Sequence, residues 1–394
     1  MEMPIDLAPF TFCANARVSF GAGKFRSLPD VISSYGDRVL LVRGSSSLEA
    51  SGKLDELQDL LDAKDITLYE SVVEGEPSPE GVDAVCDEFR SANVHAVLAI
   101  GGGSVIDAGK AISAMIPQRD GVENYLEGVG KKKHNGVKVP FIAVPTTAGT
   151  GSEATKNAVL SKVGKNGYKR SLRHDDLVPD SVTIDPELAL TCPEGVTIAC
   201  GMDAFTQLLE SYVSVKSNAW TDALCEKGIV LVSRGFESVC RDGSDLAARS
   251  AMALAAYFSG VSLANAGLGS VHGVASVAGG LFPIPHGVVC GTLLAEAAKF
   301  NVEALRTAKD KGKLGKFANA GRLLSGNRSL SDEAAADTLL ATLFRWTEDF
   351  GIPRLSDFGV KLTDLSGIAA TTDVKQNPVP MNAAQVEALL RSRL

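Results

Sequence analysis

The chain has 394 residues, 45% of them hydrophobic and 22% charged, with a formal net charge of −8. This length is too great for one compact core, so we expect two domains. The negative net charge and the scattered basic residues argue against a nucleic-acid partner, because a polyanion would be repelled.

Targeting and redox signals point to the cytoplasm. The first ten residues have neither a basic start nor an apolar core, which argues against a secretory signal. The seven cysteines form no C-x-x-C pair, so we expect reduced thiols. Cys290 lies four residues after His286, but a cysteine in apolar surroundings is most often core packing.

The predicted elements of the first half alternate between strand and helix. Short apolar runs at 38–42, 96–100 and 140–145 predict buried strands, and helical spacing of apolar residues at 53–63 and 79–92 predicts helices. This alternation predicts a mostly parallel sheet that is covered by helices.

A glycine-rich segment follows the predicted strand 96–100. Gly101, Gly102, Gly103 and Ser104 lie between that strand and a predicted helix, where free N–H groups favour an anion. The segment is not G-x-G-x-x-G, because Ile106 occupies the third glycine position, and it is not a Walker A loop. Such a segment can also be a turn that only packs the helix on the sheet.

A second glycine-rich segment, 145–155, follows the predicted strand 140–145 and carries Thr146, Thr147 and Thr150. The carboxyl ends of parallel strands share one edge, where open α/β sheets bind ligands. Two such loops favour a dinucleotide cofactor over a simple packing turn.

The pattern changes near residue 193, where helical periodicity takes over and strand patterns vanish. We therefore expect an α/β dinucleotide-binding domain over 1–191 and an all-helical domain over 192–394, with a cleft between them. Residues 250–295 contain no charged side chain, but Gly, Ser, Asn and Pro interrupt them. Buried helices explain this stretch better than a membrane span does.

The second half also carries a candidate metal site. Asp203 and Gln207 are four residues apart on one predicted helix face, and His272 and His286 lie in the uncharged stretch. One carboxylate and two imidazoles are an ordinary ligand set for a divalent metal that polarises a substrate oxygen. The alternative is that Asp203 is a cap or ion-pair partner and that the histidines are core residues.

Together these motifs resemble the iron-containing (group III) alcohol dehydrogenase family, within the dehydroquinate-synthase-like superfamily. The resemblance covers the whole chain. It rests on the segments GGGSVID (101–107), PTTAGTGSEAT (145–155), LVPDSVTIDPEL (177–188), GMDAFTQLLESYVS (201–214) and the pair VHG and PHG. It implies an NAD(P)-dependent alcohol dehydrogenase or aldehyde reductase for a small alcohol or aldehyde, assembled as a homodimer or larger oligomer.

The resemblance also implies roles for single residues. Gly102, Gly103 and Ser104 match the pyrophosphate loop. The other matched cofactor contacts are Asp107, Thr146, Thr147, Thr150, Asn157, Lys169 and Leu188. Asp203, His272 and His286 match catalytic metal ligands for Fe²⁺ or Zn²⁺.

Three positions depart from the family pattern. Gln207 replaces a histidine ligand, which predicts a weakened metal site because an amide oxygen binds such ions less strongly. Ser276 replaces a second histidine, so the proton relay would use water, Ser276 or a ribose hydroxyl. Gly44, followed by Ser45, stands where NAD-preferring relatives have an aspartate, and Arg43 precedes it, which favours NADP(H).

Two alternatives remain open. A lyase or cyclase of the dehydroquinate-synthase type needs basic residues for a polyanionic acid, and 250–295 supplies none. A metal-free nucleotide-binding pseudoenzyme would explain Gln207 and Ser276, but it has no need of two intact phosphate loops. We therefore predict metal-assisted hydride transfer, with a substrate that the sequence does not identify.

Overall fold

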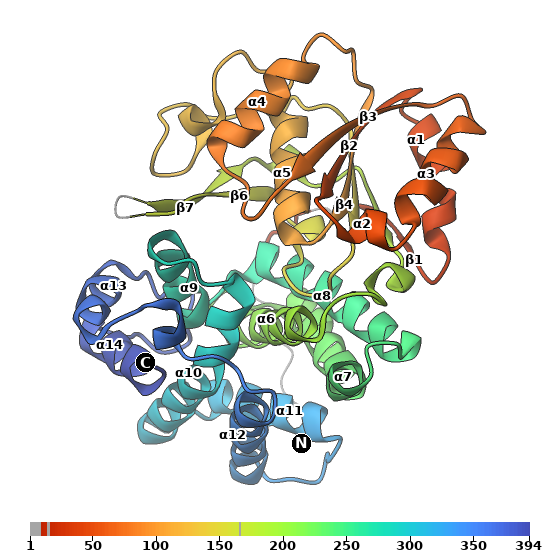
Figure 1. The fold of residues 1–394 in the computed structure, drawn as a ribbon. Helices are drawn as coiled ribbons and strands as arrows, with labels where there is room; N and C mark the ends of the chain where they lie inside the picture. The colour runs from red at the N-terminus through yellow and green to blue at the C-terminus, as the bar shows by residue number, and fades with distance from the viewer. Residues whose placement is uncertain (1–8, 14–15, 165–166) are drawn as a thin grey trace.

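The computed structural model describes residues 9–13, 16–164 and 167–394 (Figure 1). Residues 1–8, which carry most of the expectation about a secretory signal, lie outside the described part. The strands and their helices form one half of the molecule, and the helices after residue 193 form the other (Figure 1).

A six-stranded parallel sheet with the order β1-β8-β5-β4-β2-β3 organises the first half. Its strands are β1 (Arg17–Phe20), β2 (Arg38–Gly44), β3 (Thr67–Val73), β4 (Ala96–Gly101), β5 (Phe141–Pro145) and β8 (Ser181–Ile184). The three strands expected from the sequence are β2, β4 and β5. They are buried nearly throughout, because strands covered on both faces need continuous apolar runs. The predicted parallel sheet is confirmed.

Helices cover both faces of this sheet. They are α1 (Leu28–Ser33), α2 (Ser47–Ala50), α3 (Lys53–Asp62), α4 (Pro79–Phe89) and α5 (Gly103–Met115). Short 3-10 turns are η1 (Lys24–Ser27), η2 (Val122–Tyr125), η3 (Ser152–Ala154), η4 (Asp175–Leu177) and η5 (Pro186–Ala189). Helices α3 and α4 confirm the two helical predictions. Helix α4 ends three residues early, and the chain reaches a left-handed conformation at Asn93 soon afterwards.

A separate antiparallel ribbon, β6 (Asn157–Lys162) and β7 (Tyr168–Arg173), was not predicted. Its strands mix polar and apolar residues without a clean alternation, so periodicity gives no strand signal. The ribbon lies beside α9 (Ser270–Leu281), where Gly164 N donates to Gly280 O (Figure 1).

The second half is helical, as expected, and the described residues after Ile184 include no strand. Its helices are α6 (Glu194–Val213), α7 (Ala219–Arg241), α8 (Leu246–Ala266), α9, α10 (His286–Ala308), α11 (Lys311–Ser325), α12 (Asp332–Asp349), α13 (Leu365–Thr371) and α14 (Ala383–Ser392), with η6 (Leu355–Phe358) and η7 (Leu362–Asp364). By length and composition alone, α8 is apolar enough to cross a membrane. Its apolar window is 56% buried, as a core helix is.

The loop after β5 is packed tightly between the two halves. A Cβ atom on Gly260 of α8 would lie 2.3 Å from Gly151 O, and a Cβ atom on Gly149 would lie 2.7 Å from Cys200 Cβ. Only glycine permits such close backbone approach. The loop is therefore held against α6 and α8.

We predict that Gly260→Ala lowers the free energy of unfolding by about 1–3 kcal/mol, because the added methyl group must displace backbone. Gly315→Ala in α11 is the matched control. Its Cβ meets nothing within 4 Å, so the variant should gain about 0.5–1 kcal/mol of helix stability. Chemical denaturation measures both. Equal effects in the two variants would contradict the close approach.

Candidate metal and nucleotide site

Three segments meet at one edge of the sheet. Gly44 ends β2 and Ser45 follows it, Gly101 ends β4 and Gly102 to Ser104 follow it, and Thr146 to Thr150 follow β5. Strand β4 pairs with both β2 and β5, so these carboxyl ends are neighbours. Thr146 N donates to Gly101 O at 2.9 Å. The structure thus brings the two glycine-rich loops into contact.

The first loop leaves its backbone open to a ligand. Helix α5 begins at Gly103 and has no side-chain cap, so its first N–H groups have no partner within the helix. A Cβ atom on Gly103 would lie 2.6 Å from Thr150 Oγ1, whereas one on Gly102 would only touch Thr147 at 3.4 Å. This exposed helix start suits a pyrophosphate.

A buried lysine holds the two loops together from below. Lys110 is 1% exposed and donates to the carbonyl oxygens of Ser152, Thr155 and Asn157 at 2.6, 2.8 and 2.8 Å. Burial lowers the pKa of Lys110 to about 8 and raises the pKa of Asp107 to about 6. Asp107 and the Asn157 carbonyl therefore lie beneath the two loops, where Asp107 is buried and the carbonyl binds Lys110.

The remaining predicted cofactor contacts, Asn157, Lys169 and Leu188, lie on β6, β7 and η5. Lys169 on β7 donates to a carboxylate oxygen of Glu76 at 2.8 Å. Leu188 in η5 is 9% exposed and belongs to the apolar core on one face of the sheet. The cofactor roles of Asn157, Lys169 and Leu188 stay predictions.

Three helices converge on a cluster of metal-binding side chains. Asp203 comes from α6, His272 from α9, and His286 and Cys290 from α10, with all donor atoms within 4.8 Å of one another. His272 Nε2 lies 3.3 Å and His286 Nε2 lies 3.7 Å from Asp203 Oδ1. Cys290 Sγ lies 3.6 Å from His272 Nε2 and 3.7 Å from His286 Nε2. The three expected residues are brought together, and Cys290 joins them.

These donor atoms fit a divalent ion. Metal bonds of about 2.0–2.3 Å in a tetrahedron place neighbouring donors about 3.3–3.8 Å apart, and the four distances above lie in this range. Carboxylate, imidazole and thiolate groups are ordinary ligands of zinc and of related transition metals.

Glu210 holds His272 in place, and sequence analysis missed it. Its buried carboxylate accepts from His272 Nδ1 at 2.7 Å and from the backbone N–H groups of Gly269 and Val271 at 2.9 and 2.7 Å. The bond to Nδ1 orients the ring so that Nε2 faces the cluster. Glu210 lies seven residues after Asp203, hence on the same helix face, and this spacing could have indicated it.

In this cluster, burial and contacts between the side chains shift the pKa values in opposite directions. Burial alone would raise the pKa of Asp203, but the two histidines hold it below its ordinary value. Burial alone would lower the pKa of His272, but Cys290, Asp203 and Glu210 raise it well above its ordinary value. Burial lowers the pKa of His286 to about 4, so this imidazole is neutral at pH 7 and offers a lone pair.

Gln207, predicted as a ligand, has partners elsewhere. Its Nε2 donates to Thr150 O at 3.1 Å, and its Oε1 accepts from Ser259 Oγ at 2.6 Å. The amide therefore links α6 to the second glycine-rich loop and to α8. Its role as a ligand stays a prediction.

A cation lies beside the cluster, although the sequence showed no basic group nearby. Lys375, between α13 and α14, donates to His272 O at 3.2 Å and to Ser276 Oγ at 3.3 Å. No described carboxylate forms an ion pair with it. The residue lies far along the chain from the uncharged stretch, so only the fold reveals its position.

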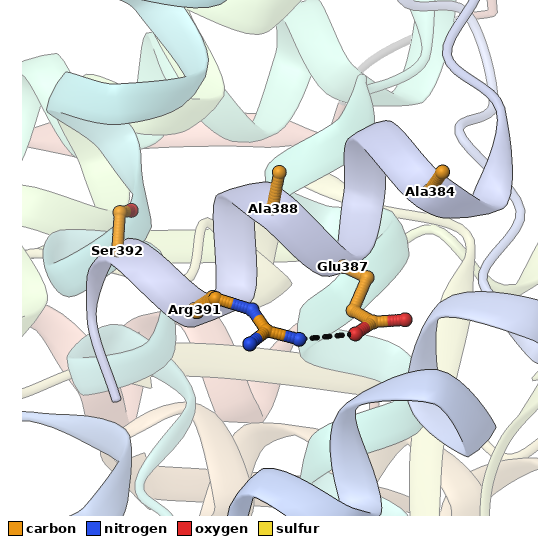
Figure 2. Close-up of a pocket in the computed structure, with 5 residues that line it drawn as sticks. All are labelled: Ala384, Glu387, Ala388, Arg391 and Ser392. Carbon is orange, nitrogen blue, oxygen red and sulfur yellow. Dashed lines mark hydrogen bonds and ion pairs between the residues drawn. The ribbon is translucent and has the colours of Figure 1, made fainter.

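Figure 2 shows a separate hollow on α14. Its lining residues are Ala384, Glu387, Ala388, Arg391 and Ser392, and Arg391 pairs with Glu387 at 2.6 Å. All five lie on one helix, and no predicted site residue is among them. This hollow therefore contributes nothing to the candidate site.

Comparisons with known proteins match both halves. The model described as "Iron-containing alcohol dehydrogenase" matches residues 15–186, and that of the "Fe-containing alcohol dehydrogenase family, C-terminal" matches 197–394. The chain is 31% identical over 382 residues to an NAD-dependent methanol dehydrogenase of Bacillus methanolicus, covering 95% of this chain and 97% of the relative. It is 32% identical over 382 residues to a 1,3-propanediol dehydrogenase of Klebsiella pneumoniae, covering 92% and 95%. A crystal structure of 1,3-propanediol oxidoreductase superimposes with a TM-score of 0.88 at 30% identity, covering 98% of this chain and 100% of that one.

We predict that Gly103→Ala raises the Kd for NADH and NADPH about 10-fold, or about 1.4 kcal/mol, because the new methyl group pushes Thr150 out of place. Coenzyme fluorescence titration measures the effect. Gly195→Ala, in the first turn of α6, should leave both constants unchanged, since its Cβ meets nothing within 4 Å. An unchanged Kd in folded Gly103→Ala protein would contradict the assignment of the loop.

Proposed function

Because the chain belongs to the iron-containing alcohol dehydrogenase family and is an oxidoreductase acting on CH–OH groups, we propose that it interconverts a small alcohol and its aldehyde with NAD(P)(H) at a metal centre. The convergence of Asp203, His272 and His286 from three helices carries this proposal. Relatives named as methanol and 1,3-propanediol dehydrogenases support a small substrate.

Each segment of the site has a distinct task in this proposal. The N–H groups of Gly101 to Ser104 bind the pyrophosphate, and Thr146 to Thr150 line the nicotinamide side. Asp203, His272 and His286 hold the ion, and Glu210 orients His272. When bound, a divalent ion supplies Lewis acidity toward the substrate oxygen and a nicotinamide supplies or accepts hydride.

Ser276 is the candidate group for proton transfer, since it occupies the position of the missing histidine one turn after His272. Its Oγ accepts from the Lys375 ammonium and donates to His272 O. We further place the enzyme in the cytoplasm as a homodimer or larger oligomer. The described cysteines are all free, in keeping with a reducing compartment.

For the coenzyme, we propose a preference for NADP(H). Arg43 contributes less than expected, because its guanidinium pairs with Glu70 at 2.6 Å and donates to Gly44 O. The support therefore comes from the absence of a carboxylate at Gly44 and from the hydroxyl of Ser45.

We predict that His272→Ala lowers aldehyde reductase activity at least about 100-fold and loses bound metal, since removing a ligand exceeds the ~10–100-fold effect of losing an outer partner. The measurement is a screen of aldehydes with NADH and NADPH, with and without Fe²⁺ or Zn²⁺. His174→Ala, at the histidine that caps η4 and does not belong to the cluster, is the matched control and should keep full activity. Full activity in His272→Ala would refute the metal centre, and no net coenzyme turnover with any aldehyde would refute the reaction.

We also predict that Gly44→Asp lowers kcat/KM for NADPH about 10-fold relative to NADH, because the carboxylate repels the 2′-phosphate. The side chain fits, since a Cβ at this position meets only Val105 Cγ2 at 3.8 Å. Gly44→Asn has the same size without the charge and should shift the ratio less. An unchanged NADPH/NADH ratio in Gly44→Asp would show that the adenosine ribose lies elsewhere.

A further inference from the structure

We propose that the thiolate of Cys290, and not the amide of Gln207, is the fourth protein ligand of the metal. The site would then be Asp/His/His/Cys, a set that favours Zn²⁺ over Fe²⁺. This inference rests on the metal centre proposed above and adds the identity of one donor atom.

The position of Cys290 carries the first step. It lies four residues after His286 on α10, so both side chains project from one helix face toward Asp203. The distances from Sγ to the two imidazole Nε2 atoms are 3.6 and 3.7 Å. With a Zn–S bond of about 2.3 Å and a Zn–N bond of about 2.0–2.1 Å, a tetrahedral edge is about 3.5–3.6 Å. The distances from Cys290 Sγ to the two Nε2 atoms therefore match those between ligands of one zinc ion.

The hydrogen bonds of Gln207 carry the second step. Thr150 O can only accept, so it must face Nε2, which directs Oε1 to the Ser259 hydroxyl at 2.6 Å. Gln207 is 2% exposed and Ser259 is fully buried. Turning the amide toward an ion would remove the Nε2 donor from Thr150 O, whereas Ser259 Oγ would keep Ala256 O as its acceptor at 2.7 Å. Gln207 therefore links α6 to α8 and to the loop after β5.

Charge and donor softness carry the third step. Binding of a divalent cation displaces the thiol proton of Cys290 to solvent, so the bound sulfur is a thiolate. Together with the Asp203 carboxylate it supplies two negative charges, which match the charge of the ion. A soft thiolate favours zinc over iron at a single-metal site.

The test uses the full-length chain, stripped by a chelator and reloaded with Co²⁺ or Zn²⁺. We expect one ion per chain, a near-ultraviolet thiolate-to-cobalt band, and a sulfur neighbour at about 2.3 Å from Zn²⁺ in X-ray absorption. Cys290→Ser should lose the band and bind Zn²⁺ at least about 10-fold more weakly. Gln207→Ala should keep the band. Cys200→Ser, at a second thiol near Asp203 but outside the cluster, is the matched control and should also keep it.

The outcomes separate this inference from the proposed function. Wild-type protein that binds one ion without the band and without a sulfur neighbour overturns the thiolate ligand alone. Loss of the band in Gln207→Ala but not in Cys290→Ser also overturns it. Failure of wild-type protein to bind any metal overturns both proposals. Equal concentrations of Fe²⁺ and Zn²⁺ test the preference, and an unchanged bound ratio in Cys290→Ser refutes it. X-ray absorption needs only wild-type protein, so a misfolded variant does not remove the test.

Discussion

The buried carboxylate of Glu210 is the constraint on which the metal site depends. A buried charge is tolerated only when it is fully paired, and here two N–H groups of the first turn of α9 and His272 Nδ1 supply the partners. The same contacts start α9 and set the orientation of the His272 ring. A Cβ atom on Gly269 would lie 2.8 Å from Glu210 Oε1, so a larger residue there would displace the carboxylate. One carboxylate therefore both caps the start of α9 and orients the candidate ligand His272.

The loop after β5 connects α6 to the glycine-rich loop after β4. Thr150 accepts from Gln207 through its backbone and faces the position of Gly103 through its side chain. Lys110 fixes the following turn from the α/β half, through the carbonyls of Ser152 and Thr155. The candidate metal cluster and the glycine-rich loop after β4 are thus connected by hydrogen bonds and close packing. Rigid placement of this kind holds a coenzyme and a substrate at a productive distance.

The sequence predicts elements whose pattern is contained in a short segment, and it does not predict contacts between distant segments. Strands β2, β4 and β5 are continuous apolar runs and were predictable, whereas the ribbon of β6 and β7 is half polar and was not. Resemblance predicted that Asp203, His272 and His286 belong together, since no spacing rule relates three separate helices. Glu210 and Cys290 lie at helical spacing from those ligands, but only tertiary contact distinguishes them from ordinary core residues. Lys375 gave no sequence signal at all.

The exchange of ligand type has a chemical consequence for the proposed site. A thiolate in place of the neutral imidazole expected at Gln207 lowers the net charge of the metal and its ligands by one unit. Electron donation from sulfur also makes the ion a weaker Lewis acid, which disfavours an alkoxide. The Lys375 ammonium, bound to His272 O and Ser276 Oγ, adds positive charge at the same place. Lys375 is exposed, so solvent screens its charge, and it offsets only a small part of what the thiolate removes. In this proposal Cys290 and Lys375 set the charge of one site with opposite signs, while Gln207 links α6 to the loop after β5.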